Sequence, residues 1–191
     1  MKIAVDIDGV LLDLMVTFCE IFNQRYNTNY RKKDVISWEF FKDWNVSEKE
    51  SYEIFYKIYE NSSSVPFIDE NAPVILKKLN NIHHVDIVSA RTSKYRHQLI
   101  KKLHEHDIKK GVQYVNLILV NHKPYDKKLD LKYDIYVEDN PNLVERVRKM
   151  KEKFLLLYDQ PWNQHCICEE NVIRVYNWNE IYENMKRLEK G

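Results

Sequence analysis

The sequence predicts an α/β fold in which a parallel sheet is flanked by helices. Short apolar runs alternate with segments of helical periodicity along most of the 191 residues, and this alternation is typical of parallel strands joined by crossover helices. With 44% hydrophobic residues, a chain of this length can bury one substantial core and carry a smaller insertion. We therefore expect a single catalytic unit.

The N-terminal part of the chain predicts one strand followed by a group of helices. Residues 3–7 are expected to form a buried strand. A helix follows in which four side chains keep helical spacing: Phe18, Ile21, Phe22 and Tyr26. Residues 31–45 are irregular, and Ser47 with Glu50 then forms a capping-box pattern that predicts a helix through about Tyr59. This stretch indicates a small helical insertion.

The remainder of the chain resumes the alternation of strands and helices. Further strands are expected at residues 84–89, 116–120, 134–137, 154–158 and 172–176. Helices are expected at residues 73–79, 95–106, 140–151 and 179–188. Pro73 suits the first turn of one helix, and Ser93 is placed to cap the next. We assign residues 1–13 and 70–191 to the core and residues 14–69 to a small helical cap.

Charge and composition argue against several classes of partner. The 30 Lys and Arg residues are balanced by 29 Asp and Glu residues, so no net field attracts nucleic acid or an anionic membrane. The sequence begins without the pattern of a secretory leader, and no apolar run approaches the roughly 18 residues of a membrane span. We expect a soluble, cytoplasmic protein with reduced thiols that acts on a small molecule.

Two carboxylates stand at the end of the first predicted strand. Asp6 and Asp8 are two residues apart, so an extended backbone would point both side chains to the same side. Gly9 lets the chain turn sharply after them. One carboxylate can attack phosphorus, and the other can protonate the leaving oxygen and later activate water. The pattern favours phosphoryl transfer, and the alternative is a helix cap and an edge carboxylate beside a turn.

Polar residues also follow two other predicted strands and lie between them in the sequence. Residues 89–92 (Ser-Ala-Arg-Thr) follow the second strand, residues 138–140 (Glu-Asp-Asn) follow the fourth, and a lysine-rich segment spans residues 123–128. Ligands of such folds bind at the carboxyl ends of the parallel strands. There a hydroxyl can bind a phosphoryl oxygen, a lysine can offset its charge, and a carboxylate can complete a Mg²⁺ site with Asp6.

In these features the chain resembles the haloacid dehalogenase superfamily of phosphotransferases. The order is the same: D-x-D at Asp6 and Asp8, a serine after a strand, a lysine, and a closing acidic pair. Residues 128–141 are similar to the lysine-to-acidic-pair segment of the 5'(3')-deoxyribonucleotidase family, and residues 157–163 (Leu-Tyr-Asp-Gln-Pro-Trp-Asn) to its later signature. The resemblance implies a Rossmann-like core, a small cap, and Mg²⁺-dependent hydrolysis of nucleoside monophosphates through an aspartyl-phosphate intermediate.

The resemblance assigns a role to each acidic residue of the set. Asp6 would be the nucleophile, and Asp8 would be the general acid and base. Mg²⁺ would be held by Asp6, the main-chain carbonyl of Asp8, and Asp139. The commoner form of the closing pair is Asp-Asp, whereas Glu138 stands first here. Glu138 would act through water or orient its neighbour.

The resemblance also assigns the groups that bind the phosphoryl moiety. They would be Ser89, Ala90, Arg91 and Lys128. Lys128 would bridge the nucleophile and the phosphate, and a shift of its loop would substitute Lys127 or Lys123. Ser89 has the alternative role of a loop cap, and Arg91 that of a solvated charge at a helix entry.

The sequence leaves two other functions open. The same catalytic residues would serve a phosphatase for another small phosphomonoester, such as a sugar or cofactor phosphate. A regulatory nucleotide-binding protein would keep the fold and the metal without turnover, although binding alone requires neither a nucleophile nor a proton shuttle. Six aromatic residues could fill the core or stack on a base, and we expect one or two to face substrate: Phe18, Phe22, Trp38, Phe40, Phe41 and Trp44.

Overall fold

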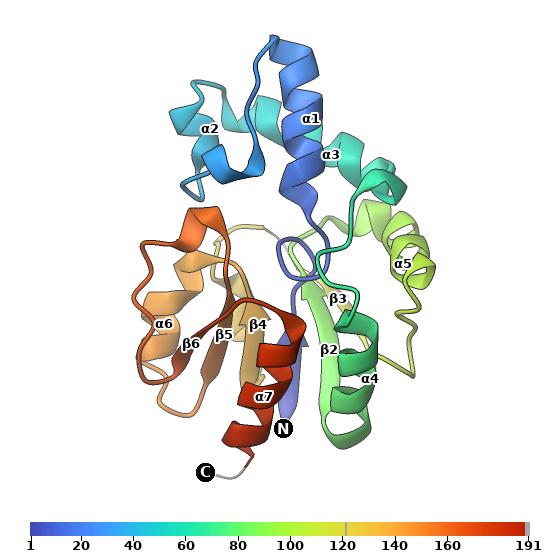
Figure 1. Ribbon diagram of the computed structural model, residues 1–191, viewed down its shortest axis with the longest axis vertical. Helices are drawn as coiled ribbons and strands as arrows, with labels where there is room; N and C mark the ends of the chain where they lie inside the picture. The colour runs from blue at the N-terminus through green and yellow to red at the C-terminus, as the bar shows by residue number, and fades with distance from the viewer. Residues whose placement is uncertain (121, 190–191) are drawn as a thin grey trace.

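The computed structural model describes residues 1–120 and 122–189, and this part of the chain forms a six-stranded parallel sheet flanked by helices (Figure 1). The strands lie in the order β3-β2-β1-β4-β5-β6. They are β1 (Lys2–Val5), β2 (His84–Ser89), β3 (Leu117–Leu119), β4 (Ile135–Glu138), β5 (Phe154–Tyr158) and β6 (Val172–Val175). Every neighbouring pair is parallel, so the predicted fold class is confirmed.

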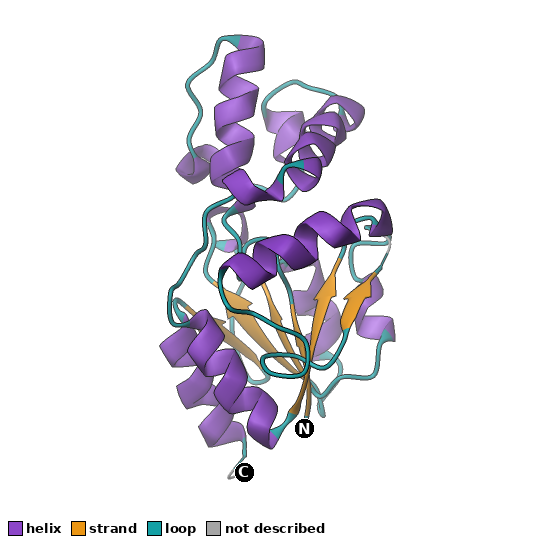
Figure 2. Ribbon diagram, turned by 90° about the vertical axis from the view of Figure 1, so that its right-hand side faces the viewer, coloured by secondary structure: helices purple, strands orange, loops and turns teal. Residues whose placement is uncertain are grey.

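Helices pack on the sheet and extend beyond one end of it (Figure 2). The α-helices in the described residues are α1 (Leu14–Tyr26), α2 (Phe40–Asp43), α3 (Glu48–Glu60), α4 (Ala72–Ile82), α5 (Arg96–Glu105), α6 (Val144–Arg148) and α7 (Trp178–Leu188). Among the residues that the structure describes, no helix combines the length and apolar character that crossing a bilayer requires.

The topology of the sheet places its switch point between β1 and β4. β1 lies between β2 and β4 and pairs with both, so that Ile3 is opposite Val85 of β2 and Ile135 of β4. The chain adds β2 and β3 on one side of β1, and β4, β5 and β6 on the other. Connections that leave β1 and β4 therefore diverge, and ligands of such sheets bind where they do. Asp6 follows β1 and Asp139 follows β4, so the fold brings these carboxylates together.

Helices α1, α2 and α3 lie beyond the carboxyl ends of the strands (Figure 1). Their aromatic side chains pack on one another, with ring centroids 5.0 Å apart for Phe18 and Phe40 and 4.9 Å apart for Phe22 and Trp44. Burial of these rings stabilises the three helices, and the rings belong to the same hydrophobic cluster as residues of the sheet. Three of the six aromatic residues considered above also line the cavity described below: Trp38, Phe40 and Phe41.

Two predicted helix starts have different outcomes. The capping box before α3 is present, because Ser47 Oγ accepts from the Glu50 N–H at 3.2 Å and Glu50 Oε2 accepts from the Ser47 N–H at 3.0 Å. The cap assigned to Ser93 is wrong. Thr92 takes that role, since its hydroxyl accepts from the Lys94 N–H at 3.4 Å and begins a 3₁₀ turn before α5.

The helix expected at residues 140–151 is shorter than predicted. Asn140 caps a 3₁₀ turn by accepting from the Asn142 N–H at 2.9 Å, and α6 then ends at Arg148. The side-chain amide of Asn171 explains this end, because its Nδ2 lies within hydrogen-bond distance of one carbonyl in the last turn and two beyond it: those of Val147, Met150 and Lys153. These carbonyls are satisfied without a further helical turn.

Candidate active site

A tight loop after β1 carries Asp6 and Asp8. The strand ends at Val5, two residues before the end that was predicted from sequence. Three N–H groups donate to the carbonyl of Ile7, and these belong to Val10, Leu11 and Leu12. The turn, not an extended backbone, therefore sets the relation of the two carboxylates. Asp6 and Asp8 nevertheless line the same cavity.

Asp6 is buried, and contacts on two sides fix its orientation. Its Oδ1 accepts from the Ile7 N–H at 2.7 Å, and its Oδ2 lies 2.7 Å from Lys128 Nζ. The same ammonium group lies 2.5 Å from Glu138 Oε1. Burial would lower the pKa of Lys128, but the charges of Asp6 and Glu138 raise it above its ordinary value. Lys128 therefore stays protonated beside the nucleophile candidate.

The geometry separates Lys128 from the other two lysines that the sequence left open. Lys128 is 4% exposed and reaches Asp6. Lys123 instead lies 2.7 Å from Glu48 of α3, and Lys127 lies 3.4 Å from Asp130. Both of those side chains are about half exposed. Of the three lysines, Lys128 is therefore the one that the structure places against Asp6 and Glu138.

Three carboxylates meet at the switch point of the sheet. Ligand atoms of Asp6, Glu138 and Asp139 all lie within 4.8 Å of one another. Within the described residues, Glu138 Oε2 and Asp139 Oδ1 are buried without a hydrogen-bond partner. Burial, followed by the charge of Asp6, raises the pKa values of Glu138 and Asp139 well above the ordinary range. A divalent cation with oxygen ligands would supply the missing positive charge, so this donor set fits Mg²⁺.

The backbone at Gly9 lies against Asp139. Gly9 has a φ of 81°, and a Cβ there would come within 1.9 Å of Asp139 Oδ2. Trp162 Nε1 donates to that Oδ2 at 3.1 Å, and Asn163 Nδ2 donates to the Asp139 carbonyl at 2.9 Å. Gln160 Nε2 donates to the Gly9 carbonyl at 2.7 Å. These three side chains lie in residues 157–163, which resemble the family's later signature, but no role was predicted for them from sequence.

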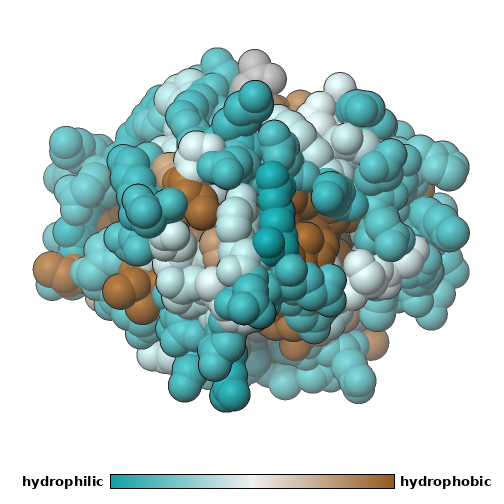
Figure 3. All heavy atoms as spheres, turned by 90° about the horizontal axis from the view of Figure 1, so that it is seen from above, coloured by the Kyte–Doolittle hydropathy of each residue, from teal (hydrophilic) through white to brown (hydrophobic). Residues whose placement is uncertain are grey.

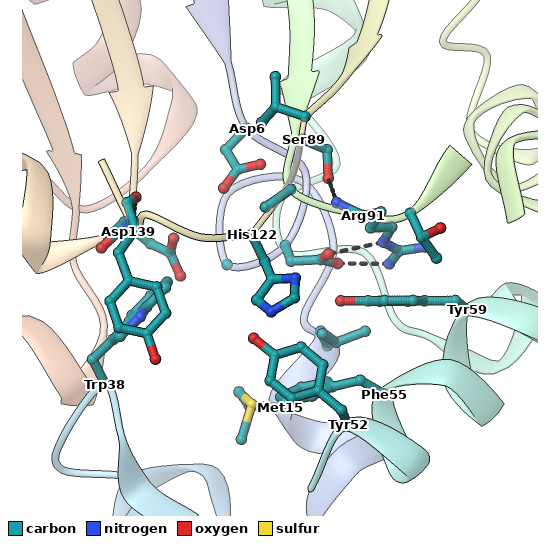
Figure 4. A pocket seen from close by; sticks show the side chains of 18 of the residues that line it. Asp6, Met15, Trp38, Tyr52, Phe55, Tyr59, Ser89, Arg91, His122 and Asp139 are labelled. Carbon is teal, nitrogen blue, oxygen red and sulfur yellow. Dashed lines mark hydrogen bonds and ion pairs between the residues drawn. The ribbon is translucent and has the colours of Figure 1, made fainter. Parts of the chain in front are cut away.

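Residues that follow β2 form the other wall of the site. Ser89, Ala90 and Arg91 line the cavity, and Ser89 Oγ accepts from the Arg91 N–H at 3.2 Å. Ser89 therefore makes the loop-capping contact and also faces the cavity. Arg91 is 2% exposed and pairs with Asp8 (Figure 4), so its interpretation as a solvated charge is wrong. A partner 83 residues away in sequence draws the guanidinium inside.

A cavity of about 270 Å³ lies between the strand ends and the helices beyond them. Figure 4 shows Asp6 and Ser89 on one side of it, and Met15, Tyr52 and Phe55 on the opposite side. His122 closes part of the remaining wall, with its ring centroid 4.7 Å from that of Tyr52. Seen from above, the outer surface is mostly hydrophilic with scattered hydrophobic patches (Figure 3). Within the cavity, the side with Asp6 and Ser89 is a polar floor, and the side with Tyr52 and Phe55 is an aromatic roof.

Comparison with known proteins identifies similar sequences over the whole described chain. A family model described as "5' nucleotidase, deoxy (Pyrimidine), cytosolic type C protein" matches residues 1–189. A nucleotidase from Clostridium acetobutylicum is 27% identical over 189 residues, which cover 98% of this chain and 95% of that protein. A 5'(3')-deoxyribonucleotidase from Bacillus subtilis is 25% identical over 179 residues, which cover 94% and 95% of the two chains.

Solved structures share the fold at low sequence identity. A haloacid dehalogenase-like protein from Agrobacterium tumefaciens superimposes with a TM-score of 0.63 at 12% identity, covering 98% of each chain. A hydrolase of the haloacid dehalogenase-like family from Streptococcus pneumoniae gives a TM-score of 0.64 at 12% identity, covering 96% of this chain and 97% of that one. These similarities support the Rossmann-like architecture of the sheet and its helices.

Proposed function

Because the chain belongs to the family of 5' nucleotidase, deoxy (pyrimidine), cytosolic type C proteins, which are phosphomonoester hydrolases, we propose that it hydrolyses (deoxy)nucleoside monophosphates through an aspartyl-phosphate on Asp6. One observation carries this proposal. Asp6 lies at the floor of the cavity, bound to the Lys128 ammonium at 2.7 Å, with Asp8 lining the same space. A buried carboxylate beside a fixed cation, with a second carboxylate at hand, suits covalent phosphoryl transfer.

The proposed reaction has two displacement steps. Asp6 attacks phosphorus, and the bond from phosphorus to the leaving oxygen breaks while Asp8 gives that oxygen its proton. In the second step Asp8 takes a proton from water, whose oxygen attacks phosphorus and breaks the bond to Asp6. Lys128 and Ser89 would bind the phosphoryl oxygens and offset charge that develops on them. The products are the nucleoside and inorganic phosphate, and Asp6 is regenerated.

Mg²⁺ is the cofactor that fits the acidic cluster. Asp6, the main-chain carbonyl of Asp8, and Asp139 would hold the ion, since Asp139 Oδ1 is a buried acceptor without a partner in the described residues. When bound, the ion would reduce repulsion between the anionic carboxylate and the anionic phosphate. Glu138 would orient Lys128 through their contact at 2.5 Å.

The aromatic roof supports a nucleotide over a smaller phosphomonoester. A nucleobase has two flat apolar faces, and aromatic rings stack on such faces favourably. Trp38, Phe41, Tyr52 and Phe55 line the cavity, and Figure 4 shows Tyr52 and Phe55 on the side opposite Asp6. A sugar phosphate would leave this surface without a matching partner. We therefore expect the base to lie against the roof while the phosphate reaches Ser89 and Lys128.

Phosphate release from a panel of esters tests the proposal. Ribo- and deoxyribonucleoside 5'- and 3'-monophosphates are compared with sugar phosphates, with Mg²⁺ or with EDTA. We expect hydrolysis that prefers deoxynucleotides, stops with EDTA, and is lost in Asp6→Asn. Asp107→Asn is the matched control, because Asp107 is exposed and pairs only with its neighbour Lys109 among the described residues. A preference for sugar phosphates would discard the nucleotide, and absence of all hydrolysis would support a binding protein.

A further inference from the structure

The guanidinium of Arg91 holds both carboxylate oxygens of Asp8. Nε donates to Asp8 Oδ2 at 2.8 Å, and Nη2 donates to Oδ1 at 2.6 Å (Figure 4). Such a two-pronged contact fixes the plane of a carboxylate as well as its position, which a single contact does not. The Asp8 side chain therefore has one defined orientation at the edge of the cavity.

Arg91 is itself held by the segment that forms the cap. Nη1 donates to Ser62 Oγ at 3.0 Å, and the guanidinium carbon lies 4.6 Å from the centre of the Tyr59 ring. Both of these contacts come from the end of α3 and the turn after it. The main-chain N–H of Arg91 binds Ser89 at 3.2 Å. Arg91 thus links the cap, the loop after β2 and the loop after β1.

All three side-chain nitrogens of Arg91 are already donors in this arrangement. Asp8 and Ser62 take three of its five N–H groups, so a direct contact with substrate phosphate, which the sequence suggested, is left with one N–H on each of Nη1 and Nη2. The side chain is 2% exposed, so a movement away from Asp8 would break buried contacts. These contacts direct the Nε and Nη2 edge of the guanidinium to Asp8, at the wall of the cavity that Arg91 also lines.

We propose that Arg91 is a positioning residue, which orients Asp8 toward the leaving-group oxygen and receives the carboxylate that forms when Asp8 has given up its proton. This inference rests on the proposed hydrolysis. In the first step the proton moves from one Asp8 oxygen to the departing oxygen as its bond to phosphorus breaks. The carboxylate that remains regains both donors of Arg91, and the later proton from water reverses this change. Arg91 neither gains nor loses a proton.

Leaving-group dependence tests this role. A deoxynucleoside leaves as an alkoxide that needs a proton, whereas p-nitrophenolate leaves as a stable anion without one. For Arg91→Gln we expect kcat/KM to fall about 100-fold with a deoxynucleoside monophosphate and by less than about threefold with p-nitrophenyl phosphate. Arg91→Lys should lie between, because it keeps the charge but loses the fork. Arg25→Gln, at an exposed pair on α1, should match wild type with both esters.

Two comparisons separate positioning from other roles. If Arg91 acts through Asp8, the double variant Asp8→Asn with Arg91→Gln is no slower than Asp8→Asn alone. Equal losses with both esters, together with weaker inhibition by inorganic phosphate, would overturn the proposal in favour of direct phosphate binding. Activity toward p-nitrophenyl phosphate also reports that the variant is folded.

Two further results are decisive for the proposal. If Arg91→Gln does not fold, Ser62→Ala replaces it, because that change removes the Nη1 partner and the hydroxyl's bonds to the Ile58 and Tyr59 carbonyls but leaves the Arg91 side chain in place. A loss that is several-fold for the nucleotide and absent for p-nitrophenyl phosphate would then support positioning, and equal losses would overturn it. A wild-type protein without Asp6-dependent hydrolysis of either ester would instead refute the proposed function itself, and this inference with it.

Discussion

Gly9 is the residue on which the close packing of the acidic cluster depends. Its positive φ of 81° suits glycine, and its Cα lies where any added Cβ would meet Asp139 Oδ2 at 1.9 Å. Gly111 has nearly the same φ, 82°, but nothing lies within 4 Å of the site of its Cβ. The two glycines therefore differ in steric surroundings and not in backbone conformation.

Alanine substitution at these glycines separates strain from crowding. For Gly111→Ala we expect the free energy of unfolding to fall by about 1 kcal/mol from the left-handed backbone alone. For Gly9→Ala we expect a loss of about 3 kcal/mol or more, since displacement of Asp139 adds to that strain. Urea unfolding of both variants measures the difference. Equal losses would show that Gly9 does not press on Asp139 in solution.

The residues of the candidate site could be selected from sequence by their types, but their contacts could not be predicted. Asp6, Asp8 and Asp139 could be selected because a carboxylate after a strand of a parallel sheet has few structural reasons to be there. The position of Lys128 needed distances, because three lysines lie in one short segment. Arg91 could not be understood from its neighbours in sequence, because its partners Asp8 and Ser62 are 83 and 29 residues away.

At the scale of elements, strands were easier to predict than helix ends. β2 and β5 have the predicted bounds, since each is a short apolar run in a sheet that is buried on both faces. Helix ends depend on single side chains. Thr92 and Ser93 are adjacent hydroxyls, and only the backbone geometry decides which one caps. The end of α6 depends on Asn171, which no local pattern connects to it.

The capping box of α3 should contribute measurably to stability. This helix carries Tyr52, Phe55 and Tyr59 to the cavity, and its first turn is held by Ser47 and Glu50. For Ser47→Ala we expect the free energy of unfolding to fall by about 1 kcal/mol. Ser47→Asp keeps an acceptor for the Glu50 N–H and should retain most of the stability. Chemical unfolding of the two variants tests this, and equal losses would contradict a capping role.

At the scale of the whole molecule, burial of the acidic cluster links its protonation to folding. The pKa values of Glu138 and Asp139 are raised by burial and by the charge of Asp6. Above the ordinary carboxyl pKa of about 4, the folded protein therefore binds protons that the unfolded chain has released. The contribution of the cluster to stability falls as pH rises through this window, up to the raised pKa values.

Mg²⁺ should offset this loss, because it binds the ionised carboxylates. We expect the melting temperature to be higher with Mg²⁺ than with EDTA. The difference should be larger at about pH 8 than at about pH 6, since fewer protons then compete with the ion. Asp139→Asn should reduce the effect at both pH values. A Mg²⁺ shift that is absent, or the same in Asp139→Asn and wild type, would show that the cluster is not the metal site.

The assembled fold also explains why substrate specificity is the property that is hardest to predict from the sequence. The proposed catalytic side chains follow single strands, whereas the aromatic roof is built from α2, α3 and the loop that contains His122 and Tyr125. Its shape depends on how these separate segments pack together. From sequence we expected one or two of six cap aromatics to face substrate. In the structure three of those six line the cavity, together with tyrosines that were not considered.

The central claim is that Asp6 carries the phosphoryl group between the two steps. A single turnover with a deoxynucleoside monophosphate and Mg²⁺, quenched in acid and followed by peptide mass spectrometry, tests it most directly. We expect one phosphoryl group on Asp6, absent in Asp6→Asn, and longer-lived in Asp8→Asn when p-nitrophenyl phosphate, whose leaving group needs no proton, forms it. Phosphate released throughout the time course while Asp6 stays unmodified, or a phosphoryl group on another residue, would contradict the claim.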